Sequence, residues 1–76
     1  MLLSEKIKIL IMRRKKSQKE IAEAIGMSAE GFNNKLRREY FKPEELQKIG
    51  AALGCDVIMP PPVIPIFKMT DTGEEI

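Results

Sequence analysis

The chain has 76 residues, a formal net charge of +2, no histidine and a single cysteine. A domain of this size removes only about 60% of its extended-chain surface from water, so association with a second subunit would stabilise it. Because the sequence also lacks a metal-ligand cluster and a phosphate-binding glycine loop, we expect no catalytic residues, no metal ion or other cofactor, and no enzymatic activity.

Positive charge is concentrated in the first part of the chain. Residues 1–42 contain 11 lysines and arginines against 5 acidic residues, or +6, whereas residues 43–76 contain 2 against 6, or −4. Such an asymmetry is typical of a protein that binds a polyanion through one segment, although an ordinary solvated surface would give the same distribution.

The cysteine count and the apolar runs indicate the compartment. Cys55 has no partner within the chain, so no internal disulfide is possible, which fits a reducing environment. No apolar run is as long as a membrane span, and the amino-terminal residues lack the charge order and cleavage site of a signal peptide. We therefore expect a cytoplasmic protein without membrane contact, in which Cys55 is a small packing residue just after a helix.

The first predicted helix covers residues 3–15, with Ser4 able to cap its N-terminus. Its apolar residues are spaced to form one inward face, which consists of Leu3, Ile7, Leu10 and Ile11. The helix ends in a basic run that suits the negative end of the helix dipole, and this run consists of Arg13, Arg14, Lys15 and Lys16.

The segment SQKEIAEAIGMSAEGFNNKLRR, residues 17–38, predicts two short helices joined by a tight turn. Ser17 and Glu20 have the spacing of a capping box, in which each side chain accepts the other residue's amide proton. Gly26 stands where the chain must reverse, and glycine adopts the left-handed backbone conformation without steric cost. The pattern indicates that a second helix follows this turn closely.

Residues 28–38 predict that second helix, with Ser28 as its N-cap and Phe32 and Leu36 as its buried stripe. Asn33 and Asn34 are poor helix formers with no evident packing role, which favours a functional one. Side chains of the outward face suit base edges in a DNA major groove, since Asn can pair with adenine and Arg with guanine. These outward residues are Ser28, Ala29, Glu30, Asn33, Asn34 and Arg37.

This segment resembles the Cro/repressor (XRE-like, lambda-repressor-like) helix-turn-helix family of phage and bacterial regulators. The matching positions are Gln18, Ile21, Ala22, Gly26, Met27 and Phe32, and the likeness covers residues 3–54, about two thirds of the chain. One departure is Lys35, where the family usually has an apolar residue and this chain has one at Leu36 instead.

The resemblance implies a sequence-specific regulator of transcription, a repressor by family precedent, that binds double-stranded DNA as a homodimer. Residues 28–38 would enter the major groove in half-sites about one helical turn apart. The base-reading residues would be the six outward ones of that helix. Contacts to backbone phosphates would come from a second set, Lys16, Ser17, Gln18, Lys19, Lys35, Arg38, Tyr40 and Lys42, with solvated surface as the alternative for each.

A fourth helix is predicted to begin at Pro43, a favoured first helical position, and to end at Gly54. Its core stripe consists of Leu46, Ile49 and Leu53. In the connection before it, either Tyr40 or Phe41 should pack on the core. The expected fold is therefore mainly α, a small four-helix helix-turn-helix domain, followed by a short C-terminal β-strand or hairpin.

Residues 56–76 differ in composition from residues 1–55, and we treat them as a separate segment. Two β-branched runs separated by prolines predict one or two strands, both of whose faces are largely apolar. Such strands need cover, which a second chain would provide through Val57, Met59, Val63, Ile64, Ile66, Phe67 and Met69. The alternatives are packing on the chain's own first helix, or an antitoxin-like module that binds a partner protein through residues 56–69. Residues 70–76 are predicted to fray.

Overall fold

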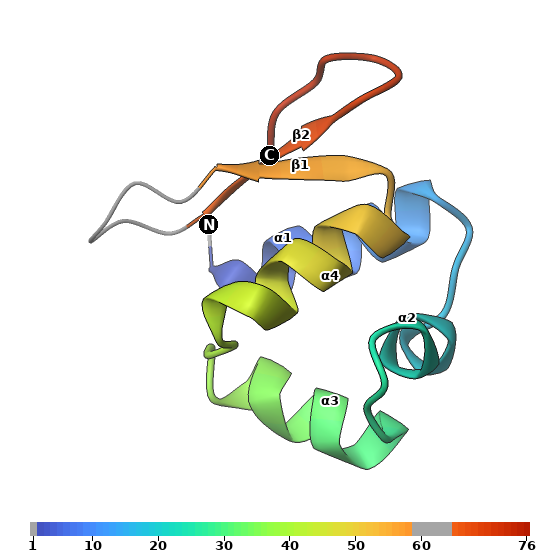
Figure 1. Ribbon diagram of the computed structural model, residues 1–76, viewed down its shortest axis with the longest axis vertical. Coiled ribbons are helices and arrows are strands. Elements are labelled where there is room, and N and C mark those ends of the chain that lie inside the picture. The colour runs from blue at the N-terminus through green and yellow to red at the C-terminus, as the bar shows by residue number, and fades with distance from the viewer. Residues whose placement is uncertain (1, 59–64) are drawn as a thin grey trace.

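A computed structural model describes residues 2–58 and 65–76 and shows a mainly helical protein with a C-terminal β-hairpin. In the described residues, the elements follow the order α1 (Leu3–Arg13), α2 (Gln18–Ala24), α3 (Ala29–Arg37), α4 (Pro43–Ala52), β1 (Cys55–Ile58) and β2 (Ile66–Met69). The four expected helices and the expected hairpin are confirmed. Figure 1 shows the hairpin on one side of α1 and α4, and α3 on the opposite side.

Helix α1 begins at Leu3 as predicted, but its N-cap and its C-terminal end differ from the prediction. Leu2 and not Ser4 is the N-cap residue, and the amide of Leu2 donates to the carboxylate of Glu5 at 3.0 Å. The helix ends at Arg13, two residues early, since Lys15 takes a left-handed conformation with φ 56°. Leu3, in the first turn, is 7% exposed and belongs to the core.

The two helices around Gly26 form as the local signals predict. The hydroxyl of Ser17 accepts the Glu20 amide proton and the carboxylate of Glu20 accepts the Ser17 amide proton, both at 3.1 Å. Gly26 has φ 76° in the turn, and the hydroxyl of Ser28 accepts a hydrogen bond from the Gly31 amide at 3.0 Å. These caps fix where α2 and α3 begin.

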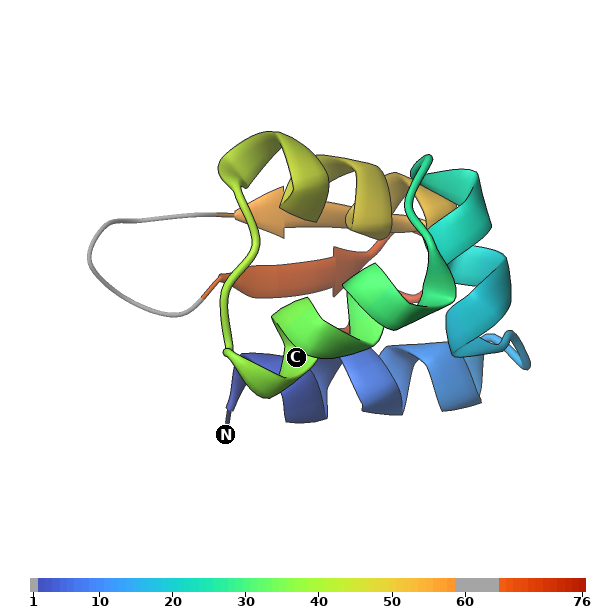
Figure 2. The ribbon, with the colours of Figure 1, turned by 90° about the horizontal axis from the view of Figure 1, so that it is seen from below.

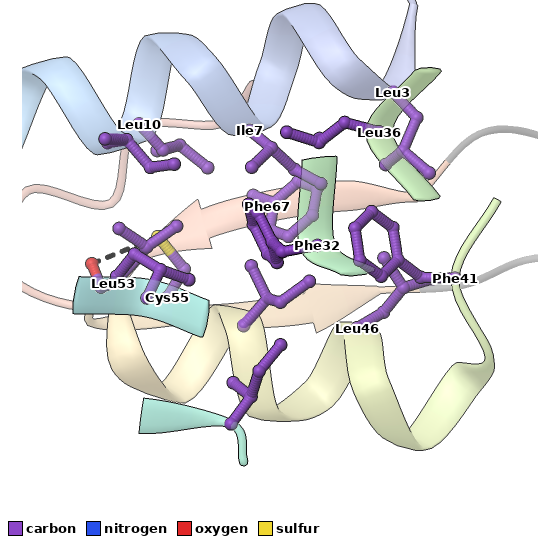
Figure 3. Close-up of a cluster of buried hydrophobic side chains, with 14 of the residues drawn as sticks. Leu3, Ile7, Leu10, Phe32, Leu36, Phe41, Leu46, Leu53, Cys55 and Phe67 are labelled. Carbon is purple, nitrogen blue, oxygen red and sulfur yellow. Dashed lines mark hydrogen bonds between the residues drawn. The ribbon is translucent and has the colours of Figure 1, made fainter. Parts of the chain in front are cut away.

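The core gathers apolar side chains from all four helices and both strands, as Figure 3 shows. Phe32 lies at its centre, fully buried, and packs against Phe41 with ring centroids 5.4 Å apart. Of the two candidates before α4, Phe41 is therefore the core residue and Tyr40 is exposed. Cys55 is buried at the start of β1, as expected of a small packing residue.

The hairpin packs on its own domain. Strands β1 and β2 are antiparallel, with Val57 opposite Phe67. Phe67 is 0% and Met69 3% exposed, so both side chains belong to the core. The prediction that residues 70–76 fray is wrong, because Phe67 and Ile76 exchange two backbone hydrogen bonds of 2.9 Å, and the Met69 amide donates to the Glu74 carbonyl at 2.8 Å.

Arg14 links the end of α1 to the end of α4 and to the turn after β2. Its guanidinium donates to the Leu53 carbonyl at 2.8 Å and, with two nitrogens, to both carboxylate oxygens of Asp71 at 2.7 and 2.8 Å. The hydrogen bonds from Arg14 lower the pKa of Asp71 to about 2. This bidentate pair holds the C-terminal segment in place.

Helix α4 approaches β1 most closely at Gly50, which is buried. A Cβ atom at this position would lie 2.3 Å from a methyl carbon of Val57 and 3.0 Å from the carbonyl oxygen of Cys55. Because one of these neighbours is backbone, the strand itself would have to move. The absence of a side chain at Gly50 thus sets the distance between α4 and the hairpin.

We expect the Gly50→Ala variant to be less stable than the wild type by about 1–3 kcal/mol, the usual cost of overpacking. Helix propensity alone would give the opposite sign, a gain of about 1 kcal/mol. Urea unfolding followed by circular dichroism measures the difference. Ala51→Gly, at the exposed neighbouring position, is the control and should lose about 1 kcal/mol from propensity. A Gly50→Ala variant more stable than the wild type would show that α4 and β1 are not in close contact.

Candidate nucleic-acid interface

Helix α3 buries one face and exposes the other. Phe32 and Leu36, one helical turn apart, are 0% and 2% exposed and hold the helix against the core. Of the six predicted base-reading residues, five are exposed and Asn34 is half-buried; the exposed ones are Ser28, Ala29, Glu30, Asn33 and Arg37. In Figure 2, which looks at the molecule from below, α3 crosses the front with the strands behind it. The predicted residues therefore share the outer surface of this helix.

Two of these side chains contact each other. The Nη2 atom of Arg37 donates a hydrogen bond of 2.7 Å to the Oδ1 atom of Asn34. Together with Arg38 they line a hollow of about 370 Å³. Ser28 has a structural role as well, since its hydroxyl oxygen caps the helix with one lone pair and leaves the proton and the second lone pair for other contacts.

The predicted phosphate contacts are mostly exposed. Gln18 is half-buried at the start of α2, and the exposed residues are Lys16, Ser17, Lys19, Arg38, Tyr40 and Lys42. Lys35 is the exception, because its ammonium group forms an ion pair with Glu45 of α4, where it lowers the pKa of that carboxyl. Its charge is thus neutralised within the domain, which makes Lys35 a poor candidate for a phosphate contact.

The ion pairs revise the meaning of the charge asymmetry. Each of the three pairs among the described residues joins a cation of residues 1–42 to an acid of residues 43–76: Arg13 to Glu74, Arg14 to Asp71 and Lys35 to Glu45. Part of the asymmetry therefore serves internal pairing. Internal pairing thus separates the basic run at the end of α1 into two parts. Arg13 and Arg14 bind the C-terminal segment, whereas Lys15 and Lys16 stay exposed.

The structure corrects part of the predicted dimer surface. Phe67 and Met69 are buried in their own domain, so a second chain could not contact their side chains. Val57 is half-buried and packs against the same core, and Ile66 is half-buried opposite the exposed Ile58. Three further predicted residues, Met59, Val63 and Ile64, lie outside the described residues. Among the described residues, Val57 and Ile66 are the predicted dimer contacts that stay partly exposed.

Glu39 joins two helices near the candidate interface, a role that the sequence does not reveal. It follows α3 in a left-handed conformation with φ 58°, unusual for a residue with a side chain. Its carboxylate accepts a hydrogen bond of 3.0 Å from the Ser4 amide in the first turn of α1, which lowers the pKa of Glu39. The end of α3 is thereby tied to the start of α1 across 35 residues, a distance at which no local pattern operates.

Residues 2–58 and 65–76 contain neither a metal-ligand cluster nor a membrane-spanning helix. No three His, Cys, Asp or Glu side chains there lie close enough together to hold a metal ion. None of the helices there has the length and apolar character needed to cross a membrane.

Comparison of the chain with protein-family models, with curated proteins and with solved structures finds no match. The functional interpretation therefore depends on the residues and the geometry of this chain.

We expect the Glu39→Gln variant to be less stable than the wild type at neutral pH, with a difference that shrinks in acid. A carboxyl whose pKa is lowered by folding stabilises the fold above its unfolded pKa of about 4.3, and this contribution is lost as the pH falls through the folded value. Urea unfolding at several pH values measures it. Glu23→Gln, at an exposed position in α2, should show no such loss at neutral pH. If the difference in unfolding free energy between Glu39→Gln and the wild type were the same at every pH, the ionised Glu39 carboxylate could not be what stabilises the start of α1.

Proposed function

We propose that the protein is a sequence-specific DNA-binding regulator of transcription that acts as a homodimer and inserts α3 into the major groove. One observation carries this proposal: α3 follows a glycine turn, buries Phe32 and Leu36, and presents uncharged polar and basic side chains, with Glu30 as the single acid, on its outer surface. An outer helix face of this kind, on a two-helix unit with a short turn, suits the reading of base edges.

The dimensions of α3 support this mode of binding. An α-helix with its side chains is about 10–12 Å in diameter, which fits the major groove of B-DNA, about 12 Å wide, and the 9 residues of α3 extend about 14 Å. The helix can therefore place residues from two to three turns against adjacent base pairs. Asn33 and Arg37 are one turn apart on the exposed side, so both can reach base edges from a single helix position.

Exposed cations near α3 supply the charge that binding to a polyanion needs. Lys16 and Lys19 flank the start of α2, Arg38 ends α3, and Lys42 precedes α4. In the described residues, none of the four is in an ion pair, in contrast to Lys35 and the two arginines that end α1. Their contacts with phosphates would fix the register of α3 on the duplex and make affinity fall with salt.

A protein-interaction module is the second function considered, with residues 56–69 as the segment that binds a partner. Burial of Cys55, Phe67 and Met69 in the chain's own core weighs against it, because that segment would have to leave the domain before wrapping a partner. Repression by blocking polymerase is the regulatory outcome that the family resemblance implies, and we adopt it as part of the proposal.

Selection of bound sequences from a random DNA duplex pool tests the proposal directly. We expect enrichment of a pseudo-palindrome with half-sites about one helical turn apart. The Asn33→Ala variant should lose about 1–3 kcal/mol of discrimination at one position per half-site and keep its nonspecific binding. Alanine favours the helix more than asparagine, so unfolding would not explain the loss. Failure of the wild type to enrich any sequence would reject the function.

Removal of a phosphate contact should have a different signature. Lys19→Ala should weaken binding equally on all sequences and reduce the slope of log affinity against log salt by about one unit. Fluorescence anisotropy on specific and random duplexes at several salt concentrations measures both effects. Lys68→Ala is the matched control, because β2 lies on the side of the molecule opposite α3 (Figure 1). An altered sequence preference in Lys19→Ala would contradict the phosphate role.

A further inference from the structure

The hydrogen bond between Asn34 and Arg37 restricts what α3 can read. A guanidinium group carries donors only, so the atom of Asn34 that faces Arg37 at 2.7 Å must be the amide oxygen. The amide nitrogen of Asn34 is thereby turned away from Arg37. We call these two side chains the Asn34–Arg37 pair.

The pair presents donors and little else. One of the two lone pairs of the amide oxygen is engaged by Arg37, and the groups that are left are mainly donors: the two protons on the Asn34 nitrogen and the free N–H groups of Arg37. In the part of the chain that the structure describes, neither side chain has a carboxylate partner, so Arg37 keeps its full charge. A ligand that fits the pair must therefore offer two adjacent acceptors.

The four bases differ in the acceptors and donors that they present on the major-groove edge. Guanine offers two acceptors, O6 and N7, on its major-groove edge, whereas adenine combines the N7 acceptor with an N6 donor. The bidentate pairing of asparagine with adenine needs the amide oxygen to face N6. That oxygen already accepts a hydrogen bond from Arg37, which uses one of its two lone pairs, and the N–H donors of Arg37 beside it would meet the N6 donor of adenine.

Resting on the function proposed above, we propose that the Asn34–Arg37 pair specifies a guanine in each half-site. Arg37 donates to O6 and N7 or shares these acceptors with the Asn34 nitrogen. The hollow of about 370 Å³ that Asn34, Arg37 and Arg38 line leaves space for the base edge. Because the two side chains are already hydrogen-bonded, less side-chain freedom is lost on binding than with two independent residues.

The experiment compares three proteins on the enriched site obtained by selection from a random duplex pool. In the wild type, replacing G·C by A·T at this guanine position in one half-site should lower affinity about 5- to 150-fold. In Arg37→Lys, which keeps the charge but loses the planar fork, this preference should fall several-fold, because a lysine can still donate to O6 or N7 but not in the fork geometry. Arg38→Lys, at the neighbouring arginine of the same hollow, should keep the preference. Thermal unfolding checks that both variants fold.

A modified base separates a direct contact from a preference for DNA shape. With 7-deazaguanine at that position, which lacks the N7 acceptor, the wild type should bind several-fold more weakly, and the loss should be smaller in Arg37→Lys.

Three results would overturn the guanine assignment and leave the proposed function standing. The first is a guanine preference as large in Arg37→Lys as in the wild type. The second is a preference for adenine at a position where Asn34→Ala removes it. The third is a uniform loss of affinity in Arg37→Lys on every sequence, the signature of a phosphate contact. If the wild type enriches no sequence at all, the proposed function fails, and the assignment fails with it.

Discussion

Burial of Phe32 and Leu36 is the constraint on which the rest of the structure depends. These two side chains, 0% and 2% exposed, fix the rotation of α3 about its own axis and thus decide which residues face outward. Phe32 and Leu36 are four residues apart, so the second buried position falls at Leu36. It does not fall at Lys35, where the resemblance would place an apolar residue. That lysine borders the buried stripe and reaches Glu45 on α4, while Leu36 takes the place in the core.

Two long-range polar contacts keep that face in position. Arg14 fastens the end of α1 to the end of α4 and to Asp71, and Glu39 fastens the end of α3 to the start of α1. Both join segments that are far apart in the sequence. The acidic C-terminal segment and the basic helical segment are thus partly complementary to each other. Only the cations without an internal partner are left for an external polyanion.

Local signals in the sequence account for most of the fold. The capping box at Ser17, the glycine turn at Gly26 and the proline at the start of α4 each act within a few residues, and each is found where expected. The errors concern interactions across the chain. Ser4 has the chemistry of an N-cap, yet it lies inside the helix that begins at Leu3, and its amide donates to Glu39.

In the candidate interface, too, local features can be read from the sequence and contacts between distant segments cannot. The outward face of α3 follows from helix periodicity, which operates over one turn and is legible in the sequence. The pairing of Lys35 with Glu45, the role of Glu39 and the order of residues 70–76 arise from segments that meet only in the folded chain. An apolar strand is also ambiguous in sequence, since Phe67 and Met69 are equally suited to a dimer surface and to their own core, and only the fold decides.

The relative positions of α3 and the hairpin limit how two subunits could share one operator. These elements lie on opposite sides of the domain (Figures 1 and 2). Two subunits packed through the outer faces of their hairpins would direct their α3 helices away from each other, and one straight duplex could not reach both. A dimer that reads adjacent major grooves must instead join the subunits side by side, with both α3 helices on one face. Burial of Phe67 and Met69 agrees with this, because the sheet's inner face is occupied by the domain itself, and residues 74–76 already pair with the outer edge of β2.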